Sequence, residues 1–304
     1  MIRSSRGALT ARPLACALAL SSASVASAAL PGKTIDVPFD AQRVTQHAEE
    51  AHVLRLYLAP PIASPAPVPS PPAPLPLVVY LHGVNTDHRA FRFAGHGGEP
   101  DVREITARLM GDGTVPPFVL AAPSTVVFSD FPASLWPAFD LDRLVEITTR
   151  TLRGQATLDL DRIIVVGHSG AGCNPRGGVF AAAMDTTLTL RGVMLVDTCL
   201  DLPSAPLLVD LPPTIDVVVT FQSKGWARPY EAFGEAFLGP RQARRLASGA
   251  VGRDVYEHRT PAARHAHNAM VEEAFQAYLP GLLAPRRSAA PPPLPAIAAT
   301  GVQS

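Results

Sequence analysis

One serine stands in a glycine-rich turn directly after an apolar run, in the segment IIVVGHSGAGCN at 163–174. The β-branched residues 163–166 predict a strand buried on both faces. A sharp turn from such a strand into a helix would project the Ser169 hydroxyl above the sheet and place the next N–H at a helix start. A serine needs that N–H for the oxyanion, and a base to remove its proton, before it attacks a carbonyl. The segment therefore predicts either a nucleophile or a plain structural turn.

Two further interpretations of the glycine-rich turn fit the residues poorly. A phosphate-binding loop would need Gly-Lys-Ser or Gly-Lys-Thr, and this turn has no lysine. A dinucleotide site would need Gly-x-Gly-x-x-Gly spacing, which the glycines do not follow. The residues two before and two after the serine must be small in a crowded nucleophile turn, and Gly167 and Ala171 are. These points favour Ser169 as a catalytic nucleophile.

The elements that would position Ser169 alternate between strands and helices. Expected strands lie at 52–60, 75–83, 117–124, 161–169, 190–199, 214–223 and 253–260, and expected helices at 101–113, 140–152 and 268–283. This alternation predicts a single α/β domain with a mostly parallel sheet and helices on both faces. Chemistry in such sheets collects at the carboxyl ends of the strands. Pro175 and the pair Gly177-Gly178 predict that the helix after Ser169 is short or broken.

The ends of the chain predict an exported protein with a flexible tail. Three arginines, an apolar run at 14–25 and the small-x-small motif at 26–28 predict a signal peptide at 1–28 and a periplasmic or secreted product. The domain would then cover 29–283, with a proline-rich surface loop at 59–76 and a disordered proline-rich tail at 284–304.

Composition and cysteine content narrow the partners. The chain has 26 basic and 26 acidic residues and no basic stripe, which argues against nucleic acid as a partner. No segment after the signal peptide is long and apolar enough to predict a membrane span. Cys173 and Cys199 follow the signal peptide, and in an exported protein they are read as one disulfide or, alternatively, as two buried thiols. Their spacing gives no support for a zinc site.

The motifs GHSGAG after IIVV, and VVYLHG well upstream, resemble the α/β-hydrolase family over about residues 50–283. The fifth position of the family's Gly-x-Ser-x-Gly motif is Ala171 here, which is still small. The resemblance implies a serine hydrolase that cleaves a carboxylic ester or related acyl bond through an acyl-enzyme, without a metal or organic cofactor. The substrate would be a small-molecule or polymeric ester. The alternatives are an amidase, peptidase or acyltransferase with the same residues, or a binding module without turnover.

The resemblance also implies where the oxyanion donors lie. The backbone N–H groups of Gly170 and Val84 would hold the oxyanion, and the side chain of Asn85 is an alternative second donor. His82 is expected to bond to loop backbone in a structural role.

For the base, the resemblance implies a histidine at the start of the final helix, which favours His267 over His265 and His258. The most common family position for the acid follows the strand at 214–223, which has no carboxylate there. Asp197, at the end of the strand at 190–199, is therefore expected to be the acid, with Asp201 as the alternative.

Two expectations concern the surroundings of these residues. The connection from Asp197 to Asp216 is short and proline-rich, which leaves little room for a cap domain. The loop at 124–140 would then border an open site, with Trp136 and Phe139 either forming a substrate wall or packing over the sheet. A Cys173–Cys199 disulfide would join the nucleophile segment to the acid loop.

Overall fold

A computed structural model describes most of the expected domain. The described residues are 30–39, 53–60, 73–85, 89–95, 99–125, 136–137, 139–222, 230–256, 259–260 and 266–286. The predicted signal peptide, most of the loop at 59–76 and the tail beyond 286 lie outside them, as do His258 and His265.

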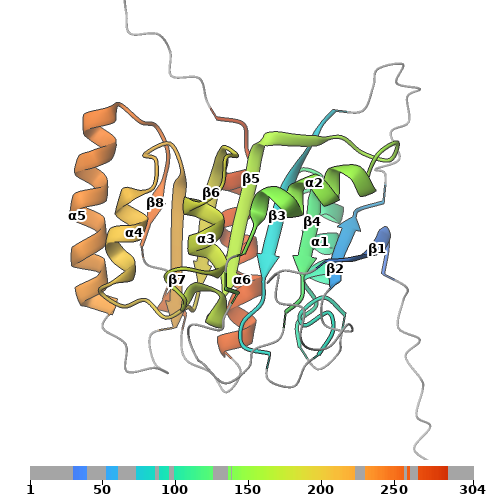
Figure 1. Ribbon diagram of the computed structural model, residues 1–304, viewed down its shortest axis with the longest axis horizontal. Coiled ribbons are helices and arrows are strands. Elements are labelled where there is room, and N and C mark those ends of the chain that lie inside the picture. Colours follow the sequence, from blue (N-terminus) through green and yellow to red (C-terminus); the bar gives the residue numbers. More distant parts are fainter. Residues whose placement is uncertain are drawn as a thin grey trace, which may run out of the picture.

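The described strands form one mixed sheet in the order β1-β2-β4-β3-β5-β6-β7-β8, with β9 also paired to β7 (Figure 1). Their bounds are β1 (Lys33–Pro38), β2 (Val53–Leu58), β3 (Leu75–Leu81), β4 (Val119–Pro123), β5 (Leu158–His168), β6 (Leu190–Val196), β7 (Asp216–Gln222), β8 (Asp254–Val255) and β9 (Arg259–Thr260). The pairs from β4 to β8 are parallel, whereas β2 runs antiparallel to both β1 and β4. The predicted mostly parallel sheet is confirmed.

Helices cover both faces of this sheet (Figure 1). They are α1 (Val102–Gly111), α2 (Leu141–Thr151), α3 (Gly178–Met184), α4 (Ser204–Asp210), α5 (Tyr230–Ser248) and α6 (Ala266–Leu283). One core layer joins the sheet to α2, α3, α4 and α5, and the other joins it to α1 and α6. Along β5, Ile163 and Val165 enter the first layer while Ile164 and Val166 enter the second. This alternation explains why the strand is apolar at every position.

Some elements differ from the prediction. β1 and α4 were not expected, because β1 ends in a proline and α4 has only seven residues. These residues weaken the local signals for a strand or a helix. The strand expected at 253–260 consists of β8 and β9, each two residues long.

The connection between β6 and β7 is described at every residue, and its helix is the seven-residue α4. The expectation of little or no cap domain is therefore confirmed for this connection. Among the described helices, none combines the length and the apolar character needed to cross a bilayer.

The packing under β5 makes a direct prediction about Gly167. A Cβ at this position would lie 2.1 Å from Cγ2 of the buried Val179, whereas a Cβ at Gly111, the last residue of α1, would meet nothing within 4 Å. We expect Gly167→Ala to lower the free energy of unfolding by about 1–3 kcal/mol through overpacking. Gly111→Ala should leave it unchanged or raise it by up to about 1 kcal/mol. Urea unfolding of both variants measures the difference, and equal stabilities would contradict this account of the turn.

Candidate active site

Ser169 lies where β5 ends, in a backbone conformation that most residues avoid. Its φ is 53°, and the 3-10 helix η2 (Ser169–Gly172) begins at the serine itself. A positive φ at a residue other than glycine is uncommon and marks a constrained turn. The backbone N–H of Gly170 therefore lies at the start of a helical turn, as expected for an oxyanion donor.

Close packing forces this turn to use small residues. Ala171 is fully buried, and a Cβ built on Gly167 would lie 3.4 Å from the Ala171 Cβ as well as against Val179. Gly178, the first residue of α3, has a φ of 50°, and its Cβ would lie 2.1 Å from the Ala171 carbonyl oxygen. The predicted need for small residues on both sides of Ser169 is confirmed, and the short α3 agrees with the predicted interruption.

The loop after β3 lies against Ser169. A Cβ on Gly83 would be 2.6 Å from the Ser169 Cβ and 3.3 Å from the Gly170 nitrogen. Only glycine allows this approach, which is the physical reason for the His-Gly pair in the sequence. Val84 follows Gly83 directly, so the segments that carry both expected oxyanion donors are adjacent.

Buried hydrogen bonds fix the loop after β3. The Thr125 N–H donates to His82 Nε2 at 3.0 Å, so His82 Nδ1–H donates to the Gly83 carbonyl at 2.7 Å. Trp136 Nε1–H donates to the His82 carbonyl at 2.9 Å. Burial lowers the pKa of His82 to about 3, so this ring stays neutral in the folded protein. His82 thus has the structural surroundings expected from the sequence.

The side chain of Asn85 is already engaged in the same loop. Its Nδ2 donates to the carbonyls of Arg89 and Thr125, both at 2.8 Å, and its Oδ1 accepts from the Arg89 N–H. Both amide hydrogens therefore serve backbone groups. This arrangement favours the backbone N–H of Val84 over the Asn85 side chain as the second oxyanion donor.

Asp197 and His267 meet directly. Asp197 follows β6, is fully buried, and its Oδ2 lies 2.5 Å from Nδ1 of His267 at the start of α6. A carboxylate only accepts, so Nδ1 carries the hydrogen and Nε2 of the neutral ring is left as an acceptor. Asp201, the alternative acid, is exposed, and its carboxylate accepts from the N–H and hydroxyl of Ser204 instead.

His168 connects Ser169 to His267. Its ring centroid lies 4.6 Å from that of His267, and its Nε2–H donates to the His267 carbonyl at 3.0 Å. Burial, with a further contribution from the adjacent His267, lowers the pKa of His168 to about 3. His168, the residue before Ser169, therefore holds the backbone of His267 as a neutral donor. No local sequence pattern predicts this contact, because the two residues are 99 positions apart.

Gln222 ends β7 and also contacts Asp197. Its Nε2–H donates to Asp197 Oδ2 at 2.6 Å, and the Tyr230 hydroxyl lies 3.4 Å from Oδ1. Neither residue was expected to be part of the site. The only signal in the sequence was the amide at the end of β7, the strand after which the resemblance implies a carboxylate.

A disulfide between Cys173 and Cys199 connects the two strand ends, with an S–S distance of 2.01 Å. Close packing supports the same connection, because a Cβ on Gly172 would lie 2.7 Å from Cγ2 of Thr198. The predicted disulfide is present, and it joins the segment that follows Ser169 to the loop that follows Asp197.

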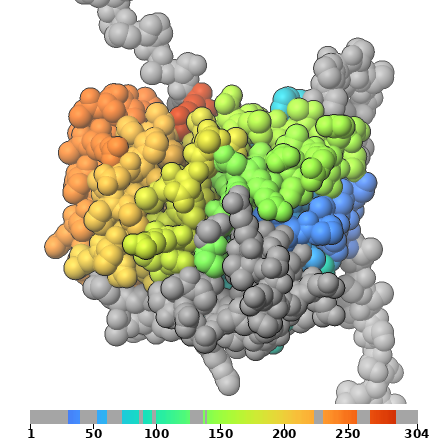
Figure 2. All heavy atoms as spheres, viewed as in Figure 1, coloured from blue at the N-terminus to red at the C-terminus, as the bar shows by residue number. Residues whose placement is uncertain are grey.

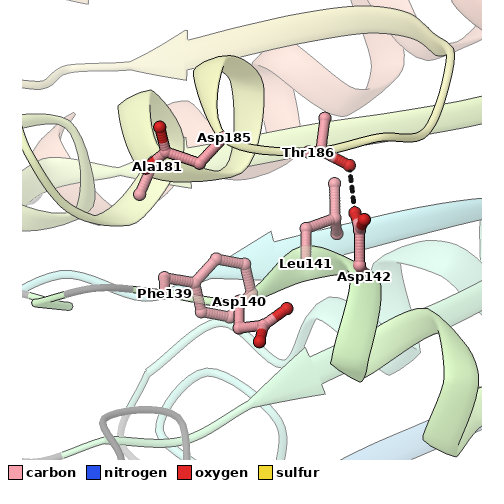
Figure 3. A pocket seen from close by; sticks show the side chains of 7 residues that line it. All are labelled: Phe139, Asp140, Leu141, Asp142, Ala181, Asp185 and Thr186. Atoms are coloured by element: carbon pink, nitrogen blue, oxygen red, sulfur yellow. Dashed lines mark hydrogen bonds between the residues drawn. The ribbon is translucent and has the colours of Figure 1, made fainter.

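Trp136 and Phe139 are packed into the protein. They are 0% and 2% exposed, and their rings meet edge to face at a centroid distance of 5.6 Å. Phe139 lines a cavity of about 410 Å³ between the start of α2 and the end of α3, where the Thr186 hydroxyl donates to Asp142 (Figure 3). Trp136 and Phe139 were expected either to form a substrate wall or to pack over the sheet. Both side chains are packed, and their rings have little exposed surface for a substrate.

The described part of the chain contains no group of three or more histidine, cysteine, aspartate or glutamate side chains arranged to hold a metal ion. The candidate site described above consists of the Ser169 turn, the His267 imidazole, the buried Asp197 carboxylate and backbone N–H groups.

No family model matches the sequence, and no curated protein sequence matches it. Similar solved structures include a ferulic acid esterase, with a TM-score of 0.50 and 11% identity over 84% of this chain and 98% of that chain. Another is a mutant of the feruloyl esterase module from Clostridium thermocellum complexed with sinapinate, with a TM-score of 0.50 and 10% identity over 84% and 89% of the two chains. At this identity the likeness concerns the fold. The chain has the α/β-hydrolase fold.

The buried neutral histidines predict how stability depends on pH. The folded-state pKa values of His82 and His168, about 3, lie below the ordinary value of 6.5, so the unfolded chain binds protons first as the pH falls. The free energy of unfolding should therefore decrease below about pH 6.5, by up to about 1.4 kcal/mol per pH unit for each ring.

Urea unfolding between pH 7 and pH 5, above the range of most carboxyl titrations, measures this dependence. His82→Gln keeps a donor and an acceptor but does not titrate, so it should reduce the slope. An unchanged slope in that variant would show that His82 does not contribute.

Proposed function

We propose that this protein is a serine hydrolase that cleaves a carboxylic ester or a related acyl bond. The observation that carries the proposal is the contact between His267 Nδ1 and the buried Asp197, next to a serine turn with positive φ. An imidazole oriented by a carboxylate beside a serine hydroxyl is the arrangement that activates serine. The α/β-hydrolase fold supports this proposal as an analogy at the level of the fold.

In the proposed first half-reaction, Ser169 Oγ attacks the substrate carbonyl carbon. His267 Nε2 accepts the serine proton and then donates it to the leaving alcohol. The N–H groups of Gly170 and Val84 donate to the oxyanion of the tetrahedral intermediate. Asp197 keeps the Nδ1–H tautomer of His267 and stabilises the imidazolium. The product of this half-reaction is an ester between Ser169 and the acyl group.

In the second half-reaction, His267 removes a proton from water, which attacks the acyl-enzyme. The same N–H groups hold the second oxyanion, and Ser169 recovers its proton from His267. The residues of the chain supply every proton transfer in this scheme.

The structures with a TM-score of 0.50 bear the names of a ferulic acid esterase and a feruloyl esterase module. These names suggest that substrates should include an aryl-acid ester such as methyl ferulate beside p-nitrophenyl esters of increasing acyl length. Matched anilides in the same panel separate ester from amide cleavage, because an amidase would use the same residues.

We further propose that the protein is exported. The Cys173–Cys199 disulfide supports this, because such bonds persist in oxidising compartments. The predicted signal peptide at 1–28 lies outside the described residues and stays a prediction.

Labelling with a fluorophosphonate probe and ester hydrolysis together test the proposed function. We expect Ser169→Ala and His267→Ala to abolish labelling and to reduce kcat/KM by at least about 10³-fold. Asp197→Asn should lose about 10²–10⁴-fold because it favours the wrong tautomer of His267. Asp201→Asn is the matched control and should keep nearly full activity, since its carboxylate contacts Ser204.

Two results would contradict the proposal. A folded wild-type protein that neither labels nor hydrolyses any ester or anilide would leave the binding-module interpretation. Full activity in Asp197→Asn with loss in Asp201→Asn would exchange the roles of the two carboxylates.

Gln222 provides a separate prediction as a positioning residue. Its amide donates to the same Asp197 oxygen that accepts from His267, so Gln222→Leu should leave a less well-fixed carboxylate. We expect kcat to fall about ten-fold, in line with the loss of one hydrogen bond to a charged group, with little change in KM. Tyr230→Phe, which removes the longer contact, is the control and should have a smaller effect. A change confined to KM would contradict a positioning role.

A further inference from the structure

A second cavity lies where the parallel strands begin, at the opposite end of these strands from Ser169. It has a volume of about 840 Å³ and is bordered by Arg191 at the start of β6, Asp216 at the start of β7, Arg253 before β8, and Arg286 after α6. We call this space the arginine cavity. The 18 residues of α6 connect the two sites, so they are separated by about 27 Å at the rise of an α-helix. The end of α6 is seen in red at the upper edge of Figure 2.

Among the described residues, Asp216 is the one carboxylate that borders the arginine cavity, and it already has cationic partners. Asp216 is 2% exposed and forms ion pairs with Arg191 and, at 3.8 Å, with Arg245. Its Oδ1 also accepts from the backbone N–H of Arg253 at 2.6 Å. Arg245 also forms an ion pair with a second carboxylate, that of Asp254, at 2.9 Å. These ion pairs balance the positive charges of the buried Arg191 and Arg245 and leave little negative charge to balance Arg253 and Arg286.

Arg253 and Arg286 lack such compensation. Among the described residues, no carboxylate lies within ion-pair distance of either guanidinium, although both side chains are exposed at the cavity. Arg286 donates to the Thr214 carbonyl, and a Cβ on Gly281 would lie 2.8 Å from Nη1 of Arg253. The guanidinium groups of Arg253 and Arg286 thus lie on the wall of the cavity, and no described carboxylate balances their charge.

The local field around these groups is positive. Burial and then the nearby Arg191 lower the pKa of Arg286, and Arg245 acts in the same direction, while Asp216 partly opposes them. The Nε of Arg191, a side chain about nine-tenths buried, has no hydrogen-bond partner. The carbonyl groups at the end of α6 offset part of this charge through the helix dipole. That offset does not provide a carboxylate for Arg253 or Arg286.

We propose that the arginine cavity binds a small organic oxyanion, through the guanidinium groups of Arg253 and Arg286. Guanidinium groups match the planar geometry of carboxylates and phosphates and donate two parallel hydrogen bonds to them. The volume falls in the range of sites for small molecules, so the ligand can carry an organic part beyond its anionic group. The proposal is independent of the reaction at Ser169.

Isothermal titration calorimetry of the full chain with inorganic phosphate, sulfate and citrate tests this site, at an ionic strength kept constant with sodium chloride. We expect saturable binding of at least one oxyanion, with phosphate separating a phosphate site from a carboxylate site that prefers citrate. The double variant Arg253→Gln/Arg286→Gln should weaken that binding ten-fold or more. The matched control, Arg143→Gln/Arg150→Gln on α2, removes two exposed arginines elsewhere and should bind like the wild type.

The outcomes separate this site from the candidate active site. Ser169→Ala should bind the oxyanion with unchanged affinity, whatever its effect on ester hydrolysis. Circular dichroism and thermal unfolding verify that the arginine variants fold. Absence of saturable binding in the wild type, or equal weakening in the two arginine double variants, would overturn the proposal.

Discussion

The candidate site depends on one register in the sheet. β5 and β6 are parallel neighbours in which His168 pairs with Val196, so the next residue along each strand, Ser169 and Asp197, leaves the sheet at the same level. β6 and β7 continue this register, with Val196 opposite Thr220, and the Asp197 N–H donates to the Thr220 carbonyl at 2.8 Å. A shift of one residue would turn these side chains to the other face of the sheet. Apolar residues on both faces of β5 and β6, and the disulfide just beyond them, stabilise the register.

Both strand ends leave the sheet through strained turns. Ser169 and Asp197 have φ values of 53° and 48°, a region in which most side chains crowd the backbone. Such conformations persist only where the surrounding packing determines them. Here Gly167, Ala171 and Gly172 permit the close approach of α3 and of the loop after β6. The turn at Asp197 directs its carboxylate to His267 at the start of α6, and the turn at Ser169 follows His168, which contacts the same histidine.

A shell of neutral hydrogen-bonding groups surrounds the contact between Asp197 and His267. His82, Trp136 and Asn85 fix the loop after β3, and His168 fixes the backbone of His267. These hydrogen bonds form without an ionised side chain, because burial keeps both histidines uncharged. Gln222 adds an amide where a carboxylate would place a second negative charge next to Asp197. These groups therefore surround the Asp197–His267 contact without adding a second charge next to the Asp197 carboxylate.

The sequence by itself determined the features that local chemistry encodes. The apolar runs predicted the central strands, and the glycines around Ser169 predicted the tight turn. The weak elements β1 and α4 were missed, because a proline or short length hides their local signals and only contacts with neighbouring elements stabilise them. Tertiary structure decided whether Asp197 or Asp201 meets His267, placed Gln222 against Asp197, buried Trp136, and gathered arginines from distant segments around one cavity. The physical reason is that these contacts join residues many positions apart, and their geometry follows from strand order and register, which no local pattern specifies.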